Sequence, residues 1–403
     1  MANYSKVQFI SWELNTGPNT VILNSGPYAG KTKSYYPGFS RNSDQRLDAY
    51  SQCMDIDARI KFTENAIDLA ATIADSDPTV LKVFMAPEFL YRGAGGAYLH
   101  DLINGWEGPP PNELGLYETP YNQKWGGLFG GLQQIAVKKA YSNWLFIFGT
   151  AISSSFPTYK DSDNKYYLDQ KKQAEAYNTA LIQLGGIGNT SANYASRKQY
   201  ISTIDFLNWY TSQTAHTMTN ILPADPRALI PADVLGVPEG GAVFNIANVN
   251  DNAGKLIDFG IEVCLDHTCS GGNKANPFGR IRTAGQYVKI QLVPSGGLHL
   301  IDASIRLQPG AGPTPNSYAF NCDGLNNLNN TVGCHTQIWN GLNGAAVPPA
   351  NKLFECSNGA ILANTQVTKV ATSVTLTGGM NVDQMRLWTY GSGHIRVVNP
   401  RPL

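Results

Sequence analysis

The chain reads Phe259-Gly260-Ile261-Glu262-Val263-Cys264-Leu265-Asp266-His267 at the point that decides its fold. An apolar, β-rich run ends at Cys264, and turn-forming residues follow it, so the sequence predicts a strand that stops at a turn. A thiolate at such a sheet edge is a ready nucleophile, and the next backbone N–H groups can form an oxyanion hole. The alternative is a buried structural cysteine, which is the commoner environment for this residue type.

A carboxylate occupies a second predicted strand end. The β-rich run Val80-Leu81-Lys82-Val83-Phe84-Met85 stops at Ala86-Pro87-Glu88, and α/β proteins place their chemistry at such edges. Glu88 can accept the thiol proton of Cys264, and His267 is the other candidate base; a solvated loop carboxylate is the alternative for Glu88. Cys269, within the turn after Cys264, is a rival nucleophile that fits the pattern less well.

Lys198 would by itself be an ordinary surface charge. Glu88, Lys198 and Cys264 nevertheless follow one another in chain order, each near a predicted strand end, and this order resembles the nitrilase (carbon–nitrogen hydrolase) superfamily. The resemblance rests on three motifs: Ala86-Pro87-Glu88-Phe89, Tyr194-Ala195-Ser196-Arg197-Lys198, and Phe259 to Asp266, which is similar to Gly-x-x-[Ile/Val]-Cys-x-Asp. Three flanking segments agree with it: Ala176-Tyr177-Asn178-Thr179-Ala180, the expected hairpin from Val243-Phe244 to Gly254-Lys255, and Leu292-Val293-Pro294.

The chain also departs from the pattern that the resemblance implies. The interval between Lys198 and Cys264 is about twice the expected length, and the excess lies in residues 207–238, which include His216. The segment after Glu88 is enlarged too, so we expect both inserts to frame the mouth of the pocket. Many members carry a second glutamate shortly after the lysine; Asp205 is the best match here, with a helix-cap or turn role as its alternative.

Periodicity predicts an alternation of strands and helices, which is typical of an α/β or layered α+β fold. The expected strands are Gln8–Trp12, Val80–Met85, Trp144–Ile152, Tyr177–Leu184, Tyr194–Lys198, Ala242–Val249, Lys255–Val263 and Tyr287–Val293, with strand-like Val367–Leu376 in the tail. The expected helices are Asp57–Ala74 and Leu128–Tyr141, and residues 13–45 and 153–172 are expected to form loops or a polar hairpin.

The resemblance implies a more specific architecture. It implies a four-layer α-β-β-α sandwich of two mixed sheets with outer helices. Residues 1–345 would form one carbon–nitrogen hydrolase domain with inserts near 93–123 and 207–238, and residues 346–403 a C-terminal extension. This extension would pack on the same domain or on a neighbouring subunit, and a homodimer or larger homo-oligomer is expected.

The chemistry that the resemblance implies is hydrolysis of an amide or nitrile through a thioester on Cys264. Glu88 would serve as base and then acid, while Lys198 and the backbone N–H of Leu265 would stabilise the oxyanion. Amide cleavage is expected before nitrile cleavage, and no metal or organic cofactor is implied. Acyl transfer to an amine, a catalytically silent scaffold, and a papain-like protease with His267, His299 or His335 as base are the alternatives.

The substrate itself is not encoded in any motif. Tyr91 and His267 are candidate substrate-binding residues, although a local hydrogen bond is the simpler role for His267. Trp106 and Trp125 would extend an aromatic pocket or serve in packing. Asp266 is expected to be structural and to bind nearby backbone amides.

Bulk composition excludes several classes of protein. The 403 residues carry 30 Lys+Arg and 30 Asp+Glu, a formal net charge of zero, which argues against nucleic-acid or acidic-membrane partners. The partner that the resemblance implies is a small-molecule amide or nitrile substrate. No signal peptide is seen, so a cytoplasmic location is expected, with signal-less export as the alternative. The spacing of Cys322, Cys334, His335 and Cys356 fits no common zinc module.

Overall fold

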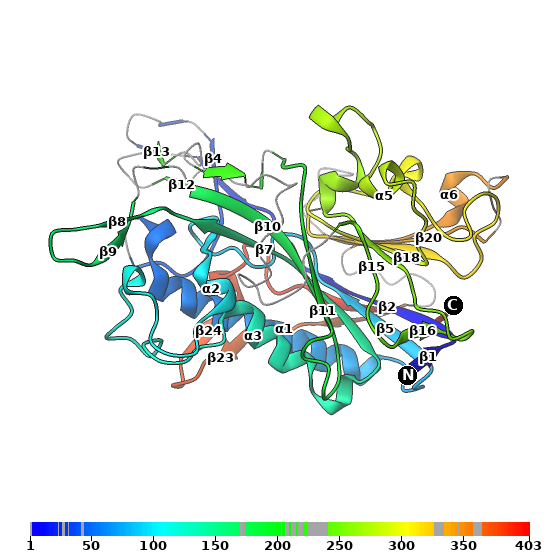
Figure 1. Ribbon diagram of the computed structural model, residues 1–403, viewed down its shortest axis with the longest axis horizontal. Helices are drawn as coiled ribbons and strands as arrows, with labels where there is room; N and C mark the ends of the chain where they lie inside the picture. Colours follow the sequence, from blue (N-terminus) through cyan, green and yellow to red (C-terminus); the bar gives the residue numbers. More distant parts are fainter. Residues whose placement is uncertain are drawn as a thin grey trace.

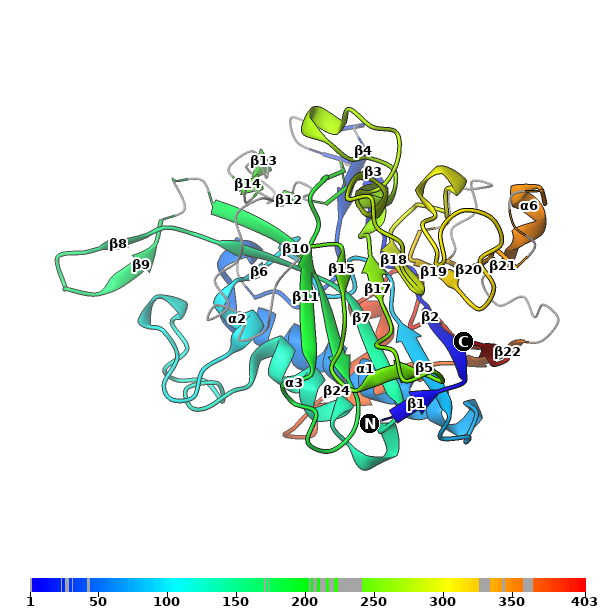
Figure 2. The ribbon, with the colours of Figure 1, turned by 45° about the vertical axis from the view of Figure 1, so that its right-hand side comes forward.

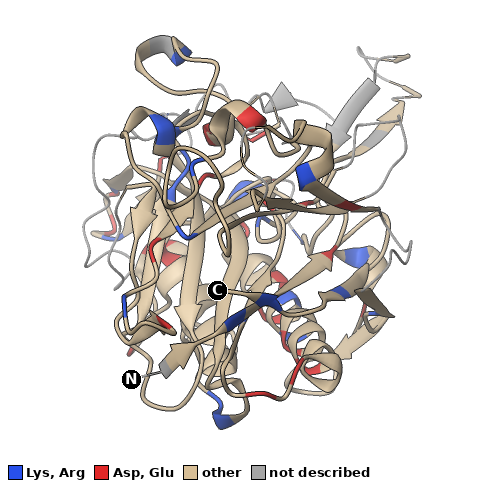
Figure 3. Ribbon diagram, turned by 90° about the vertical axis from the view of Figure 1, so that its right-hand side faces the viewer, with Lys and Arg blue, Asp and Glu red and all other residues tan. Residues whose placement is uncertain are grey.

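Among the described residues, the computed structural model has two large sheets, five two-stranded sheets and a small number of helices, which confirms the mixed α/β class (Figure 1). The structure describes residues 2–22, 24–25, 29–30, 32–41, 44–169, 172, 174–202, 204–205, 209–210, 215–216, 221–223, 241–325, 334–342, 344, 346–357 and 365–403. Within them no helix is long and apolar enough to cross a membrane. Basic and acidic positions are interspersed along the ribbon, in keeping with the balanced charge (Figure 3).

The larger sheet has ten strands. Its main path runs β11 (Asn193–Arg197), β10 (Ala174–Leu184), β7 (Trp144–Ser155), β5 (Val80–Met85), β2 (Lys6–Glu13), β25 (His394–Val398) and β22 (Thr365–Lys369). Three short strands pair beside this path: β6 (Tyr98–Leu99), β14 (Ile221–Pro223) and β26 (Arg401–Pro402). β2, β5 and β7 are parallel neighbours, whereas β10, β11, β25 and β22 are antiparallel.

The smaller sheet has six strands. They are ordered β15 (Val243–Phe244), β17 (Phe259–Ile261), β18 (Ile290–Ser295), β19 (Tyr318–Asp323), β20 (His335–Asn340) and β21 (Leu353–Ser357). β17, β18 and β19 are parallel, so their carboxyl ends meet at one edge. That edge carries Cys264, three residues after the end of β17, and Gly296, directly after β18.

One hydrophobic core lies between the two sheets. Side chains alternate along each central strand with a period of two. On β5, Val83 belongs to the same core cluster as Phe259 and Leu292 of the smaller sheet, whereas Phe84 belongs with Trp12 to the cluster on the helical side. Because β5 and β7 are buried on both faces, they are largely apolar, whereas β2, although buried, also carries Gln8, Ser11 and Glu13. This packing brings the carboxyl ends of strands from both sheets close together.

Helices cover the outer face of the larger sheet (Figures 1 and 2). α1 (Ala49–Ile73) begins earlier than predicted because Asp48 caps it by accepting from the Ser51 N–H. The predicted helix Leu128–Tyr141 is divided into α3 (Gly127–Ala136) and the 3-10 helix η3 (Lys139–Tyr141), because Lys138 adopts an extended conformation. Shorter elements on this side are η1 (Gln45–Leu47), α2 (Asp101–Asn104) and η2 (Asn112–Leu114).

The outer face of the smaller sheet has a thinner cover among the described residues. Ile281 of α5 (Arg280–Thr283) packs there with Leu300 and Leu307 against Val293 and Ala319. The other elements after Val263 are η5 (Cys264–His267), η6 (Gly272–Lys274), η7 (Asp302–Ser304) and α6 (Pro349–Lys352). α5 and α6 are single turns, so the covering on this side is mostly loop.

Several predicted segments differ in the structure. The predicted strand Ala242–Val249 is divided into β15 and β16 (Val249–Asp251), because β16 pairs with β1 (Ala2–Tyr4) instead of continuing. Residues 13–45 contain the hairpin β3 (Asn19–Ile22) and β4 (Thr32–Tyr35), and residues 153–172 contain the predicted hairpin as β8 (Thr158–Lys160) and β9 (Tyr166–Leu168). Most of residues 207–238 lie outside the described part, which includes only β12 (Trp209–Tyr210), β13 (Ala215–His216) and β14 there; the side chain of His216 is outside it.

The C-terminal segment contributes strands to the larger sheet. β25 pairs with β2, and β22 pairs with β25. Between them lie the hairpin β23 (Ser373–Thr375) and β24 (Asn381–Asp383) and the 3-10 helix η8 (Gln384–Arg386). A buried ion pair between Arg396 Nε and Glu13 Oε1, 2.6 Å apart, joins β25 to β2.

Candidate active site

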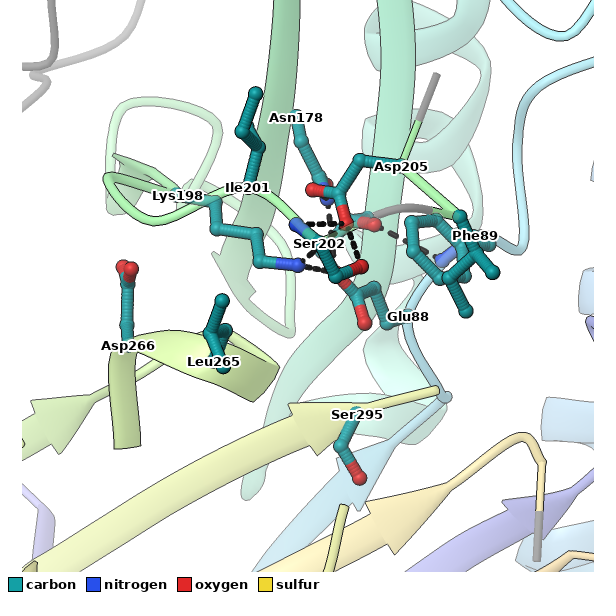
Figure 4. A network of polar contacts seen from close by, with 12 residues as sticks. Glu88, Phe89, Asn178, Lys198, Ile201, Ser202, Asp205, Leu265, Asp266 and Ser295 are labelled. Atoms are coloured by element: carbon teal, nitrogen blue, oxygen red, sulfur yellow. Dashed lines mark hydrogen bonds and ion pairs between the residues drawn. The ribbon is translucent and has the colours of Figure 1, made fainter. Parts of the chain in front are cut away.

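Three of the predicted site residues meet in one buried ion-pair network (Figure 4). Lys198 Nζ lies 2.8 Å from Glu88 Oε1 and 2.7 Å from Asp205 Oδ1. All three side chains are buried, with the side chains of Lys198, Glu88 and Asp205 at 0% exposure. The structure therefore brings together residues that stand far apart in the chain, at the carboxyl ends of β5 and β11.

The local backbone aims Glu88 into this network. β5 ends at Met85, and Gly149 of β7 approaches Pro87 so closely that a Cβ there would lie 2.1 Å from the Pro87 carbonyl oxygen. Phe89 adopts a positive φ of 66°, which few non-glycine residues do, and its N–H donates to Thr150 Oγ1 at 3.0 Å. The chain therefore turns sharply at Glu88.

Asn178 of β10 joins the two carboxylates. Its Nδ2 donates to Glu88 Oε1 at 2.8 Å and to Asp205 Oδ2 at 3.2 Å. Its backbone carbonyl accepts from the Lys198 N–H at 2.8 Å. One asparagine thus holds the side chains of both acids and the backbone of the lysine.

Asp205 is held by its own turn and by a buried arginine. Its Oδ1 accepts from the Ser202 N–H at 3.1 Å and from the Ser202 hydroxyl. Arg92 donates to the backbone carbonyls of Ile204, at 3.3 Å, and of Asp205. The turn role expected as the alternative for Asp205 and its contact with Lys198 therefore coexist.

Cys264 lies beside Glu88 at the start of η5. Its φ of +48° is a left-handed conformation, which costs a residue with a side chain about 1–3 kcal/mol and is concentrated at functional sites. A hydrogen bond from the Gly296 backbone N–H stabilises its thiolate form. Glu88 Oε2 faces the same glycine, because a Cβ at Gly296 would lie 3.2 Å from it, and this oxygen accepts no well-aligned hydrogen bond among the described residues.

Burial and mutual charges set the protonation of the group. Burial raises the pKa of Glu88 to about 7; Lys198 and a hydrogen bond with Cys264 lower it, and Asp205 raises it. Burial lowers the pKa of Lys198, but Glu88, Cys264 and Asp205 outweigh it, so that pKa is raised and the ammonium persists. Burial and Glu88 raise the pKa of Cys264 well above its ordinary value, although Lys198 and Gly296 oppose them. At neutral pH the group therefore holds a thiol, an ammonium and a carboxyl near its midpoint.

Asp266 locks the cysteine turn onto the lysine segment. Its carboxylate accepts from the backbone N–H groups of Gln199 and Tyr200, at 2.8–3.0 Å, and lies 2.9 Å from Arg280 Nη1. This confirms the structural role predicted for Asp266. The intervening Leu265 lies in the first turn of the 3-10 helix η5, where the first N–H groups have no intrahelical partner.

His267 has both ring nitrogens engaged. Nδ1 lies 2.7 Å from Glu262 Oε2, and Nε2 accepts from the Ile301 N–H at 3.1 Å. Since Nε2 accepts, the ring proton is on Nδ1. The histidine is fully buried and makes none of the described contacts with Glu88, Lys198 or Asp205, so the simpler role, a local hydrogen bond, fits its position.

The other histidines considered as bases lie elsewhere. His299 is exposed after β18, and His335 on β20 lies 3.1 Å from Asp323 Oδ2. Cys322 and Cys356 sit on β19 and β21, across β20 from each other. Among the described residues no group of three or more His, Cys, Asp or Glu is placed to hold a metal ion.

The aromatic candidates are not in this network. Tyr91 is fully buried, and its hydroxyl is 2.8 Å from Thr63 Oγ1 of α1, on the helical side of the larger sheet. Trp106 and Trp125 have ring centroids 5.0 Å apart and line a cavity of about 1340 Å³ beside α1 and α3. Neither the catalytic candidates nor Tyr91 line that cavity, so the three aromatic residues do not share a pocket.

Sequence reasoning did not assign roles to Asn178, Gly296, Arg92 or Ser202. Asn178 stood within a segment that carried the resemblance, so its position in the motif was the available signal. Gly296 and Arg92 reach the site only through pairing of distant strands and loops, which no local pattern encodes.

Comparisons with known proteins give distant likenesses. No family model and no curated protein matches the chain. Solved structures of an N-terminal amidase (12% identity, TM-score 0.29) and of an N-terminal amidase with a Gln-Val peptide (12% identity, TM-score 0.27) are similar over 73% of this chain and 48% of theirs. A complex of N-terminal amidase with an Asn-Glu-Ala peptide has 13% identity and a TM-score of 0.27. The chain thus spans about half the length of the solved chains that it matches.

Proposed function

We propose that this protein is a carbon–nitrogen hydrolase of the nitrilase superfamily, with Cys264 as nucleophile, Glu88 as acid and base, and Lys198 and Asp205 as further catalytic residues. The single observation that carries the proposal is the fully buried Glu88–Lys198–Asp205 network beside Cys264. Isolated buried charges are costly, so a network of this kind at a strand edge is a candidate for chemistry. In this proposal the two facing sheets are the inner layers of the four-layer sandwich.

The reaction would begin when Glu88 takes the Cys264 thiol proton and the sulfur attacks the carbonyl carbon of an amide. Negative charge then develops on the substrate oxygen, where the Lys198 ammonium and the Leu265 N–H stabilise it. Glu88 returns the proton to the departing amine as the C–N bond breaks, leaving a thioester on Cys264. Water activated by Glu88 then releases the acid and regenerates the thiol.

The pKa of Glu88 suits both halves of this cycle. A group with a pKa of about 7 is present as acid and as base at neutral pH, where general acid–base catalysis is most efficient. Asp205 supports it in two ways, because it keeps Lys198 protonated and raises the Glu88 pKa. An amide is the first expected substrate and a nitrile the second; we also propose that the protein acts on small molecules and forms a homo-oligomer.

Ammonia or amine release across a panel of small amides and nitriles tests this function. The wild-type protein should release product, Cys264→Ala should release none, and Cys269→Ser should behave like wild type. Intact-protein mass spectrometry should show an acyl adduct on Cys264 during turnover. Activity that survives Cys264→Ala would refute the proposal.

The alternatives give different results in the same experiments. An acyltransferase would form more hydroxamic acid than carboxylic acid when hydroxylamine is added. A silent scaffold would leave Cys264 unalkylated by iodoacetamide in the folded protein. A histidine-dependent protease would remain active in the Glu88→Gln variant, whereas the proposed enzyme would not.

A further inference from the structure

Residues 295–298, the Gly296 turn, carry the backbone group that reaches the Cys264 sulfur. Gly296 donates its N–H to that sulfur and so favours the thiolate. The next residue, Gly297, adopts a φ of 106°, a conformation that favours glycine. Because glycine is the most flexible residue, two in succession give the turn little stiffness of its own. Contacts with other segments must therefore set the direction of the Gly296 N–H.

One carboxylate, that of Asp323, gathers the polar groups of this turn. Its Oδ1 accepts hydrogen bonds from the Gly297 N–H at 2.5 Å and from the Leu298 N–H at 3.4 Å. The Ser295 hydroxyl lies 3.1 Å from the same oxygen, and it points away from the buried ion-pair network (Figure 4). The carboxylate thus holds residues on both sides of Gly296.

Strand pairing places Asp323 next to the turn. Ser295 and Asp323 are opposite each other at the ends of the parallel strands β18 and β19. The Ser295 carbonyl accepts from the Gly324 N–H at 2.8 Å and from the Glu88 N–H at 3.3 Å. The Glu88 turn, the Gly296 turn and the end of β19 are therefore joined at one point.

Burial strengthens the hold of this carboxylate. Asp323 is 0% exposed, and hydrogen bonds to an ionised acceptor are roughly twice as strong as those between neutral groups. His335 Nδ1 lies 3.1 Å from Asp323 Oδ2. Burial lowers the pKa of His335, but Asp323, Glu355 and Glu13 outweigh it, so that pKa is raised. The charged form of His335 is therefore favoured beside the carboxylate.

We propose that Asp323 is a positioning residue, whose carboxylate holds the Gly296 turn so that the Gly296 N–H points at the Cys264 sulfur. Asp323 acts through Gly296 and is not itself a catalytic residue. The inference rests on the proposed function in one respect, because it takes Cys264 as the nucleophile. It adds to that function a residue that controls how readily the thiolate forms.

Asn321 on β19 is the rival for this role. Its Nδ2 donates to the Val293 carbonyl at 3.0 Å and to the Ser295 hydroxyl at 2.9 Å. Asn321 therefore orders β18 and the first residue of the turn. Asp323 differs because it binds the backbone N–H that directly follows Gly296, and this N–H fixes the orientation of the neighbouring peptide.

Alkylation of Cys264 by iodoacetamide in the Asp323→Asn variant tests the inference. The amide keeps the shape of the side chain but is a weaker acceptor, so the turn should loosen and the thiolate should lose the hydrogen bond from Gly296. We expect the alkylation rate above about pH 8 to fall about tenfold. The midpoint of the pH profile should stay at its wild-type value, because that midpoint belongs to Glu88.

The sign of the effect separates positioning from other roles of Asp323. Removing a negative charge near a thiol favours the thiolate, so a purely electrostatic role would speed alkylation. A purely structural role would lower Tm and leave the alkylation rate of the folded protein unchanged. A faster or an unchanged rate in folded Asp323→Asn would therefore overturn the inference.

Asp258→Asn is the matched control. Asp258 precedes β17, at the end of the strand away from Cys264, and its carboxylate accepts from Asn245 Nδ2 at 2.9 Å and from Gln308 Nε2 at 2.6 Å. This variant also loses a carboxylate that accepts hydrogen bonds, so it should lower Tm. Its Cys264 should be alkylated at the wild-type rate, and a tenfold decrease there as well would count against a specific role of Asp323.

Hydrogen exchange in the wild-type protein gives a readout that does not depend on the folding of a variant. Fragmentation mass spectrometry resolves the exchange of single amides. If Asp323 holds the turn, the Gly297 N–H should exchange at least about 100-fold more slowly than an unprotected amide. Exchange at the unprotected rate would overturn the inference even if Asp323→Asn does not fold.

The inference and the proposed function can fail separately, because neither alkylation nor hydrogen exchange needs a substrate. Slower alkylation in Asp323→Asn, together with a wild-type protein that cleaves no amide or nitrile, would refute the function and leave the positioning role standing. Amide cleavage by the wild type, together with unchanged alkylation in Asp323→Asn, would refute the positioning role alone. Where hydrolysis is measured, kcat should fall about tenfold in Asp323→Asn and KM should change little.

Discussion

Replacing Asp205 by Asn removes one negative charge from the buried network and changes the shape of the side chain very little. Asp205 raises the pKa of Glu88, and a single ammonium, Lys198 Nζ, contacts both carboxylates. The substitution should therefore lower the pKa of Glu88 from its value of about 7. The size of this decrease in pKa follows from the distance between the two carboxylates.

Two carboxylates bridged by one ammonium are roughly 5 Å apart. At an effective dielectric constant of about 20, their repulsion is about 3 kcal/mol, which corresponds to about 2 pKa units. The amide dipole of Asn and relaxation of the site reduce this value. We therefore expect a downward shift of about one to two units in the pH at which Glu88 ionises.

Alkylation of Cys264 by iodoacetamide measures this shift without a substrate. The Glu88–Cys264 pair reacts only after it has lost its first proton, so the alkylation rate should rise through about pH 7 in the wild type. In Asp205→Asn the midpoint should move to about pH 5–6. Peptide mapping separates Cys264 from Cys269, which serves as the internal control. An unchanged midpoint in a variant with unchanged Tm would refute this account of the electrostatics, and Asp205→Glu should restore the wild-type midpoint.

Two further predictions concern Gly296 and Glu88. Gly296→Ala places a Cβ 2.8 Å from the buried ring of Phe89, so it should destabilise the fold by about 1–3 kcal/mol and slow alkylation of Cys264. The control is Gly272→Ala, whose Cβ meets nothing within 4 Å and which should change neither the denaturation midpoint nor the alkylation rate. Equal effects of the two variants would contradict the predicted clash. Because folding raises the Glu88 pKa from 4.5 to about 7, its contribution to stability is present below the unfolded pKa and is lost as pH rises through the folded pKa. Urea unfolding should therefore show the wild type losing about 3 kcal/mol between pH 4.5 and pH 7.5 relative to Glu88→Gln, and parallel stability–pH curves would rule this contribution out.

Several features of the fold could be predicted because they depend on local pattern. β5 has the predicted bounds Val80–Met85, and the strand of the Cys264 segment ends close to that residue. An apolar run with turn residues after it is written directly in the sequence. The predicted start of the first helix, Asp57, was wrong because the Asp48 cap of α1 lies in a segment without apolar periodicity.

The partner strand of the C-terminal segment could not be predicted from local sequence patterns. β25 lies against β2 at the other end of the chain, and the Glu13–Arg396 ion pair stabilises that contact. Short strands carry little sequence signal of which partner they choose, because pairing depends on complementary faces.

By itself the sequence determined which chemical groups stand near strand ends: a carboxylate, an amine and a thiol, in one chain order. Only the tertiary structure decided that Asn178, Gly296 and Arg92 surround them, and that Glu88 is poised near neutral pH while Cys264 keeps its proton. The physical reason is that a pKa depends on burial and on charges a few ångströms away. Those distances arise when strands from two sheets meet, and no local pattern along the chain encodes them.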